Sequence, residues 1–195
     1  MKFTHGILAL LIATNLLYGC VPVVVGGAAA GTAVVATSRR SPGAVVDDET
    51  IEMKARLTIV EHRDLNSQIH IELSSYNGVV LMTGEAPTAE LRSQTENIVK
   101  EIPMVRQIYN EMIIAEPSPF KTRANDSLIT ALVKTELLRI TDIEGFNGAR
   151  VKVVTDTGTV YLMGLLTREE AEAVTEAARR VSGVQKVVKL FEYID

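Results

Sequence analysis

Tryptophan is absent from this sequence, cysteine occurs once and histidine only three times. A single cysteine leaves no partner for an internal disulfide. The histidines and the cysteine form no cluster with the spacing of a zinc site, so no metal and no cofactor is expected. Basic residues do not exceed acidic ones, with 20 Lys and Arg against 24 Asp and Glu, and this balance argues against nucleic acid as a partner. With few aromatic residues, the hydrophobic cores must consist mainly of Val, Ile, Leu and Ala.

The patterns of a catalytic site are also missing. The histidines at 62 and 70 have no nucleophile or carboxylate at a suitable spacing, and we expect no catalytic residues. Adjacent acids occur at Asp47-Asp48-Glu49 and at Glu169-Glu170. Both groups lie where helices are expected to begin, and negative side chains stabilise the helix dipole there. The sequence therefore indicates a protein that is not an enzyme.

The N-terminus has the layout of a bacterial secretory signal. Lys2 makes the end positive, and residues 7–18 are almost entirely apolar, in a run too short for an ordinary transmembrane helix. Cys20 follows this run. The arrangement resembles a lipobox, whose cysteine becomes the acylated first residue of a lipoprotein, and implies a signal peptide over 1–19. The alternative is an uncleaved N-terminal helix with an incidental cysteine.

A segment rich in valine, alanine and glycine follows the cysteine. It is shorter than the ~20 apolar residues that a membrane-spanning helix requires, and its glycines weaken it as a helix. We interpret residues 20–45 as the lipidated cysteine and a tether near the bilayer surface. A packing face for other copies or for membrane partners is the alternative. The residue after the cysteine is Val21 and not aspartate. By the sorting rules of enterobacterial lipoproteins, the absence of aspartate at this position favours the outer membrane.

The rest of the chain contains two copies of one unit. Gly78 corresponds to Gly158 and Gly84 corresponds to Gly164, and the members of each pair are 80 positions apart. Such a constant offset indicates a tandem repeat of one structural unit. We expect Gly78 and Gly158 to lie in hairpin turns and Gly84 and Gly164 to permit close packing at strand ends. Their replacement should damage folding before function.

Each copy is predicted to contain a helix, two strands, a second helix and a third strand. In the second copy Asn125 or Asp126 can cap a helix that runs to about Leu138, and Thr167 to Glu170 has the spacing of a capping box. A closing strand of alternating character is expected over 106–114, with Ile108, Asn110, Met112 and Ile114 on one side. The other predicted strands are 70–74, 79–82, 150–155, 159–163 and 186–194, and the other predicted helix of the first copy is 89–102.

These elements predict the fold class α+β. A strand–helix–strand connection of this length favours a parallel pair joined by a right-handed crossover. We therefore expect two tandem αββαβ domains, each a small three-stranded mixed sheet packed against two helices on one face. The expected boundaries are 46–115 and 124–195, with a proline-containing linker over 116–123.

Three segments carry a family resemblance. The hairpins Gly-Val-Val-Leu-Met-Thr-Gly at 78–84 and Gly-Thr-Val-Tyr-Leu-Met-Gly at 158–164, with Val-Ser-Gly-Val-Gln-Lys-Val at 181–187, resemble the BON domain. A lipobox, a tether and two such units in this order are similar to outer-membrane lipoproteins of that family. The resemblance implies a non-enzymatic protein, lipid-anchored at the periplasmic face of the outer membrane. It also implies binding of anionic phospholipid such as phosphatidylglycerol, support of outer-membrane integrity and accumulation at division sites.

The first helix of the second copy carries two apolar stripes. The stripe of Ile129, Val133 and Leu137 suits a core face. The second stripe lies on the opposite side and is flanked by basic residues, which suits an anionic bilayer surface. The predicted membrane-contact residues are Leu128, Ala131, Leu132, Lys134, Thr135, Leu138 and Arg139.

Comparison with the first copy places the apolar excess mainly in the second, because Thr50 and Lys54 stand where Leu128 and Leu132 stand. In the family the position of Leu128 can carry tryptophan, whose amphipathic ring suits the interface better than leucine. The stripe could instead pack against the first domain or against Phe146. The alternative function is that of an adaptor, which would use the same face to bind an envelope partner such as an assembly machine, a protease or a cell-wall enzyme.

Overall fold

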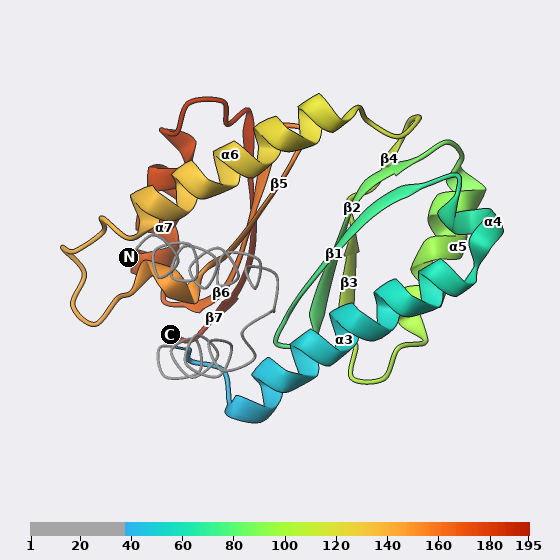
Figure 1. Cartoon of the computed structure of the whole chain (residues 1–195). Helices are drawn as coiled ribbons and strands as arrows, with labels where there is room; N and C mark the ends of the chain where they lie inside the picture. The colour runs from blue at the N-terminus through green and yellow to red at the C-terminus, as the bar shows by residue number, and fades with distance from the viewer. Residues whose placement is uncertain (1–37) are drawn as a thin grey trace, which may run out of the picture. The chain divides into compact units, whose positions relative to one another are not determined.

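The computed structural model describes residues 38–195, which lie within one compact unit of the chain. The signal peptide, Cys20 and most of the predicted tether lie outside the described residues, so these interpretations stay predictions. Figure 1 shows two successive groups of elements in the described part, each with a sheet and its own helices.

The first domain contains a sheet in which β2 is central. Strand β1 pairs with β2 antiparallel, and β3 and β4 both pair with β2 parallel. The elements are α3 (Pro42–Glu61), α4 (Arg63–Asn66), β1 (His70–Tyr76), β2 (Val79–Ala86), α5 (Ala89–Lys100), β3 (Gln107–Asn110) and β4 (Ile113–Ile114).

The second domain repeats this topology with β6 at its centre. Strand β5 pairs with β6 antiparallel, and β7 pairs with β6 parallel. The predicted fold class, α+β with two tandem αββαβ domains and mixed sheets, is confirmed. The elements are α6 (Phe120–Leu137), the short 3-10 helix η1 (Gly148–Arg150), β5 (Lys152–Asp156), β6 (Thr159–Leu166), α7 (Arg168–Arg179) and β7 (Lys186–Tyr193).

The closing strand of the first domain is interrupted, and the predicted alternation over 106–114 is wrong at its end. Asn110 is the cause, because its side-chain oxygen accepts a hydrogen bond from Met112 N at 3.2 Å while its backbone oxygen accepts one from Arg92 at 2.6 Å. The chain resumes pairing as β4, opposite Glu85 and Ala86. Met112 is buried and Ile114 is half exposed, so the two do not share an environment.

The first helix of each domain begins earlier than predicted. Helix α3 begins at Pro42, and the Ser41 hydroxyl caps it by accepting from Ala44 N at 3.1 Å. Helix α6 begins at Phe120, directly after the extended Pro119. Proline has its φ already fixed near the helical value and needs no backbone donor at a helix start, which explains the early start of α3. Asp126 and the acids at 47–49 therefore lie inside helices, and the predicted cap at Asn125 or Asp126 is wrong.

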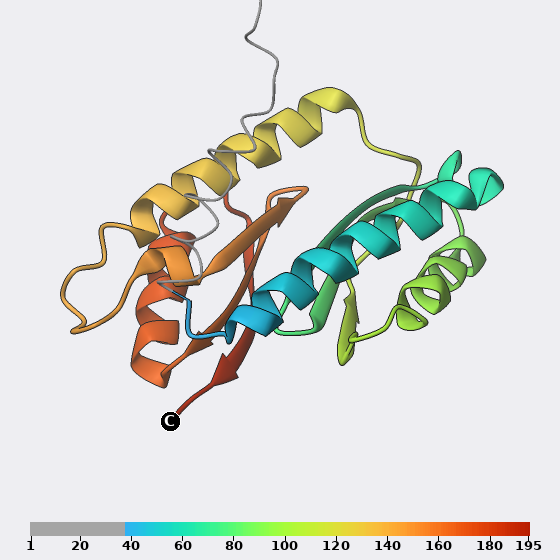
Figure 2. The ribbon, with the colours of Figure 1, turned by 60° about the horizontal axis from the view of Figure 1, so that its bottom comes forward.

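The described residues form three hydrophobic clusters, one inside each domain and one between the two sheets. On β2, Val80 and Met82 face the core under α3 and α5, whereas Val79 and Leu81 face the other way. The same alternation on β6 puts Tyr161 and Met163 into the cluster between the sheets, so both strands are buried on both faces. Helices α3 and α6 lie over the outer faces (Figure 2). Since all three clusters lie within 51–191, residues 38–195 hold complete cores and are expected to fold alone.

Candidate functional site

The outer face of α6 is the candidate site of lipid contact. Its inner face buries Ile129, Val133 and Leu137 in the core of the second domain. The side chains predicted to contact lipid lie on the opposite face and are exposed, with Leu128 58%, Leu132 42% and Leu138 61% accessible. The remaining members of the predicted set, Ala131, Lys134, Thr135 and Arg139, are exposed as well.

The alternative predicted from the sequence, in which this stripe packs against the first domain or against Phe146, is not found among the described residues. Phe146 is partly buried against the second core, together with Ile140 and Phe191. The leucines of the outer stripe remain accessible to solvent instead. The stripe therefore has the exposure that contact with a surface requires.

Polar groups on α6 favour the same contact. The Thr135 hydroxyl donates to Ala131 O at 2.9 Å, which satisfies the hydroxyl within the helix and lowers the cost of placing it in an apolar environment. Arg139 forms an exposed ion pair with Glu136, one turn away, and a pair this exposed is weak enough for the guanidinium to turn to a phosphate group instead. Because α6 begins at Phe120, it also carries the exposed Arg123, which our sequence analysis had assigned to the linker. Only the position of the helix start could have revealed that Arg123 belongs to α6.

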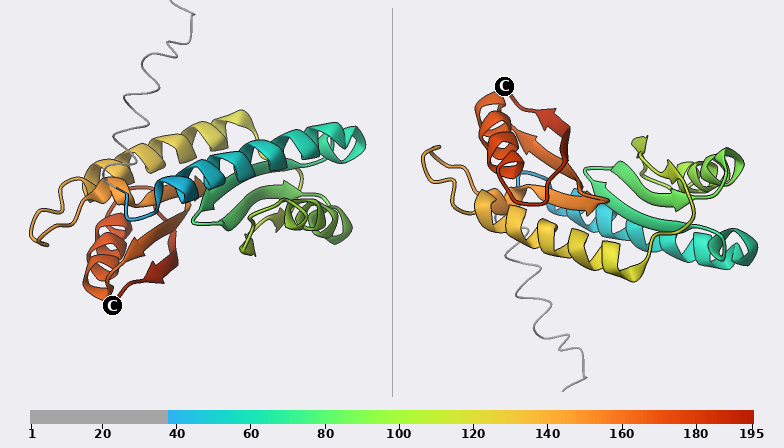
Figure 3. Two further views of the ribbon diagram at one scale, coloured as in Figure 1. Left: turned by 90° about the horizontal axis from the view of Figure 1, so that it is seen from below. Right: turned by 90° about the horizontal axis from the view of Figure 1, so that it is seen from above.

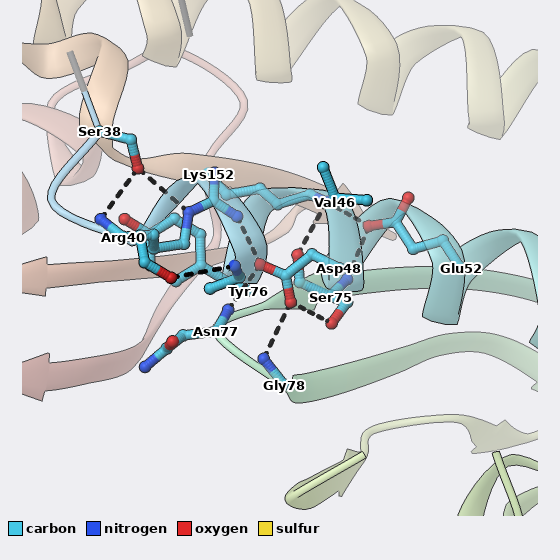
Figure 4. A network of polar contacts seen from close by, with 12 residues as sticks. Ser38, Arg40, Val46, Asp48, Glu52, Ser75, Tyr76, Asn77, Gly78 and Lys152 are labelled. Carbon is cyan, nitrogen blue, oxygen red and sulfur yellow. Dashed lines mark hydrogen bonds and ion pairs between the residues drawn. The ribbon is translucent and has the colours of Figure 1, made fainter. Parts of the chain in front are cut away.

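A pocket of about 390 Å³ lies beside the C-terminal half of α6. Lys134 and Leu138 of α6 line it together with Asp48 and Glu49 of α3. Two of its basic side chains are paired, since Arg40 contacts Asp48 at 2.6 Å and Lys152 forms an ion pair with Glu52 (Figure 4). A pocket of mixed and paired charges is a poor site for an anionic head group, so the outer face of α6 remains the stronger candidate.

Asp48 is a structural residue that we had misassigned to a helix start. Its carboxylate accepts hydrogen bonds from Ser75 Oγ at 2.7 Å, Asn77 N at 2.7 Å and Gly78 N at 2.8 Å (Figure 4). It thereby fixes α3 to the β1–β2 turn. Stabilisation of a helix dipole, the role predicted from sequence, is therefore wrong for Asp48.

Asp126 has the same role in the second domain. It accepts from Thr157 N at 3.0 Å and from Gly158 N at 2.9 Å, in the β5–β6 turn. The two aspartates recur at nearly the offset of the turn glycines, so the repeat in the sequence includes both partners of this contact. Glu170, by contrast, does lie in the first turn of α7, where the predicted capping box with Thr167 is present.

The predicted structural glycines differ in how strictly they are required. Gly84 has a φ of +112°, and a Cβ there would lie 2.2 Å from His70 O, so no other residue fits without moving backbone. Gly78 and Gly158 both have a φ of +73° in the hairpin turns. At Gly164 the atoms nearest to a Cβ would belong to the Leu166 side chain, at 3.2 Å, and not to backbone. The case for close packing is therefore strong for Gly84 and weak for Gly164.

The segment that leads into α3 is fastened to both domains. Arg39 donates to both carboxylate oxygens of Glu170, at 2.5 and 2.8 Å, and Arg40 lies over the Tyr76 ring at 4.1 Å. Burial disfavours the charged form of Glu170, but hydrogen bonds from Arg39 and Thr167 N outweigh it and hold the pKa of the carboxyl below its usual value. The chain therefore enters the folded part at the junction of the two domains.

Two further tests concern the described residues alone. No group of three or more His, Asp or Glu side chains in 38–195 is arranged to hold a metal ion. None of the helices in this range combines the length and the apolar character needed to cross a bilayer.

The fold, the repeat and the hairpin geometry agree with a match to a known family. The model of the BON domain matches residues 47–116 and 125–195. The chain therefore belongs to the BON domain family and contains two copies of that domain.

Individual relatives extend the similarity over most of the chain. The Outer membrane lipoprotein DolP of Haemophilus influenzae is 34% identical over 187 residues, which cover 95% of this chain and 94% of DolP. The 21 kDa hemolysin of Actinobacillus pleuropneumoniae is 35% identical over 155 residues, covering 80% of this chain and 78% of the hemolysin. The Osmotically-inducible protein Y of Escherichia coli is 24% identical over 156 residues, covering 78% and 76%. The similarity to DolP supports a DolP-like envelope lipoprotein of the outer membrane with two BON domains.

Proposed function

We propose that this protein is a non-enzymatic lipoprotein, anchored through Cys20, that binds the anionic phospholipid surface of its membrane through the outer face of α6. The observation that carries the proposal is the exposed stripe of Leu128, Leu132 and Leu138 beside Lys134 and Arg139. The resemblance to lipoproteins with two BON domains adds a role in outer-membrane integrity, including at division sites.

The expected strength of this contact is moderate. Full burial of a leucine side chain is worth about 1.5–3 kcal/mol, and these leucines would enter the interface only in part. Each basic side chain near an anionic surface adds about 1 kcal/mol. One helix lying at the interface therefore binds reversibly, and stable residence on the membrane needs the lipid anchor as well.

Vesicle co-sedimentation of residues 38–195 tests the proposal without the anchor. Wild-type protein should bind vesicles that contain phosphatidylglycerol better than neutral ones. Leu128→Glu should weaken binding to anionic vesicles by about tenfold or more, because it removes an exposed leucine of the stripe and adds a negative charge there. Gln94→Glu adds the same charge at an exposed position of α5 and should leave binding unchanged. Absence of wild-type binding to both kinds of vesicle would refute the proposal.

A protein partner on the same face is the second candidate. A groove of about 570 Å³ between α6 and α7 borders the stripe, and Leu132, Ile140, Ala177 and Val181 are among its lining residues. Charged side chains such as Glu136 and Arg180 line it too, so the groove suits a protein segment that carries both apolar and charged side chains. An adaptor of this kind would lose its partner with Leu132→Glu, whereas its purified domains would not bind lipid vesicles at all.

A further inference from the structure

Helix α3 carries an exposed apolar ridge of its own. Met53, Leu57 and Val60 are 56%, 56% and 52% accessible. They follow one another at helical spacing on the side opposite the buried Ile51 and Ala55. Single exposed apolar residues are ordinary, but three in one row form a patch of the kind that marks an interaction surface. The prediction that the apolar excess belongs mainly to the second domain is therefore wrong, because the first domain presents its excess one turn further along the helix.

The ridge of α3 and the stripe of α6 belong to the same side of the described unit. Helices α3 and α6 lie on one side of the two sheets in both views of Figure 3. Residues of both helices also line one pocket, with Glu49 from α3 and Leu138 from α6. A flat surface that meets the outer face of α6 would therefore approach α3 from the same side.

The chain outside the described residues leads directly into α3. The predicted anchor, Cys20, precedes Pro42 by 22 positions. An anchor at Cys20 would therefore join the folded part to the bilayer through the start of α3.

The charges beside the ridge indicate which part of α3 suits an anionic surface. Lys54 and Arg56 flank the C-terminal half, which holds Met53, Leu57 and Val60. The N-terminal half carries the exposed Asp47 and Glu49, whereas the C-terminal half has one exposed acid, Glu61, at its end. An anionic bilayer attracts the first set of side chains and repels the second, so the contact belongs to the C-terminal half.

We propose that the ridge of Met53, Leu57 and Val60 is a second surface of bilayer contact, so that the first helices of both domains lie on the membrane together. This inference rests on the proposed function, since it assigns a further part of the same membrane-facing side. The ridge contributes mainly apolar area, because the exposed acids Asp47, Glu49 and Glu61 of α3 offset Lys54 and Arg56. The head-group preference therefore resides in α6, and α3 adds affinity with little selectivity.

The absence of tryptophan from the chain allows a direct test with single reporters. Leu57→Trp, Leu128→Trp and Gln94→Trp are compared in residues 38–195 with vesicles of brominated phosphatidylcholine and phosphatidylglycerol. Bromine quenches an indole that enters the acyl region, so quenching is expected at 57 and 128 and not at 94. Quenching at 128 alone would overturn the proposal for α3 and leave the function of α6 standing. Quenching at neither position would overturn both.

A binding measurement separates the two helices. Leu57→Glu should weaken binding to neutral vesicles by about tenfold through lost apolar burial, and binding to anionic vesicles by more, because the new charge is also repelled. A double variant, Lys134→Gln with Arg139→Gln, should reduce binding to anionic vesicles alone. Gln94→Glu is the control for added charge, and circular dichroism verifies the fold. A Leu57→Glu protein that binds both vesicles like wild type contradicts the inference.

Other occupants of the ridge give different signals from the Leu57→Trp reporter. A blue shift that grows with protein concentration without lipid would show that a second copy covers the ridge. A blue shift without lipid in residues 21–195, absent in 38–195, would show that the tether covers it. Either result overturns membrane contact by α3.

Discussion

Arg39 holds the carboxylate of Glu170 with two hydrogen bonds, at 2.5 and 2.8 Å, and Glu170 at the same time caps α7 through Thr167 N. The Glu170 side chain is only 3% exposed, so the charge is held away from water by these donors. This pair joins the start of the folded part to the helix that covers the second sheet.

We expect Glu170→Gln to destabilise residues 38–195 by about 1–3 kcal/mol at neutral pH, since a buried charged acceptor is lost. The pKa of Glu170 is lowered in the folded state, so its stabilisation is present above the unfolded pKa of about 4.3 and is lost as the pH falls through the lower folded pKa. Urea unfolding at pH 7 and pH 3 measures the difference, which should shrink at the lower pH. Glu176→Gln, in the exposed pair with Arg179, should change stability by less than about 0.5 kcal/mol.

The two helix aspartates should differ in importance. Asp48→Asn leaves Arg40 without its carboxylate and disturbs contacts to Ser75, Asn77 and Gly78, so a loss of about 3–5 kcal/mol is expected. Asp126→Asn disturbs two backbone contacts and should cost about 1–3 kcal/mol. Chemical denaturation followed by circular dichroism measures both, and the exposed neighbour Asp47→Asn is the control. Equal effects of the two substitutions would contradict this account.

Replacement of the strand glycines tests the difference between the domains. Gly84→Ala should destabilise the protein by more than about 2 kcal/mol or prevent folding, because the new Cβ would lie 2.2 Å from His70 O. Gly164→Ala should cost much less, since only the Leu166 side chain must move. Thermal unfolding of the two variants gives the comparison, and a milder effect at Gly84 would show that the backbone there adjusts.

Tyr161 lies in the cluster between the sheets and should make the stability of the protein fall at alkaline pH. Burial, followed by the nearby negative charges of Glu111 and Asp156, raises the pKa of its phenol to about 12. The folded state therefore holds this proton more tightly than the unfolded state, and the resulting stability is present below about pH 10 and lost as the pH rises toward 12. Burial also raises the pKa of Tyr76, so tyrosinate absorbance should show late-titrating tyrosines, and Tyr161→Phe should remove the component near pH 12. Titration of every tyrosine near pH 10 in folded protein would refute the assignment.

Features that depend on nearby residues were predictable from the sequence. The turn at Gly158 and the capping box from Thr167 to Glu170 each involve a few consecutive residues, and both are present. The break after Asn110 was not predictable, because it depends on Arg92 from a preceding helix. The contact of Asp48 with Gly78 joins residues far apart in the chain, and it becomes visible only when α3 is placed on the hairpin.

In the candidate site, too, the sequence predicted what depends on one helix alone and missed what depends on comparison of the two domains. Helical periodicity alone identified the stripe of Leu128 and Leu132, since a helix fixes which side chains share a face. The ridge at Leu57 was missed because the comparison of the two copies tested only the positions of Thr50 and Lys54. Equivalent helices need not expose equivalent residues when their partners in the core differ.

The cluster between the sheets changes what a copy of the repeat can be by itself. Leu81 and Met163 are fully buried there, each on a strand that belongs to a different domain. A gene fragment that encoded one domain would give a protein with an apolar sheet face exposed to water. Such a protein is prone to self-association and aggregation. Each domain covers the inner sheet face of the other, so removal of either domain would expose that face of the remaining one to water.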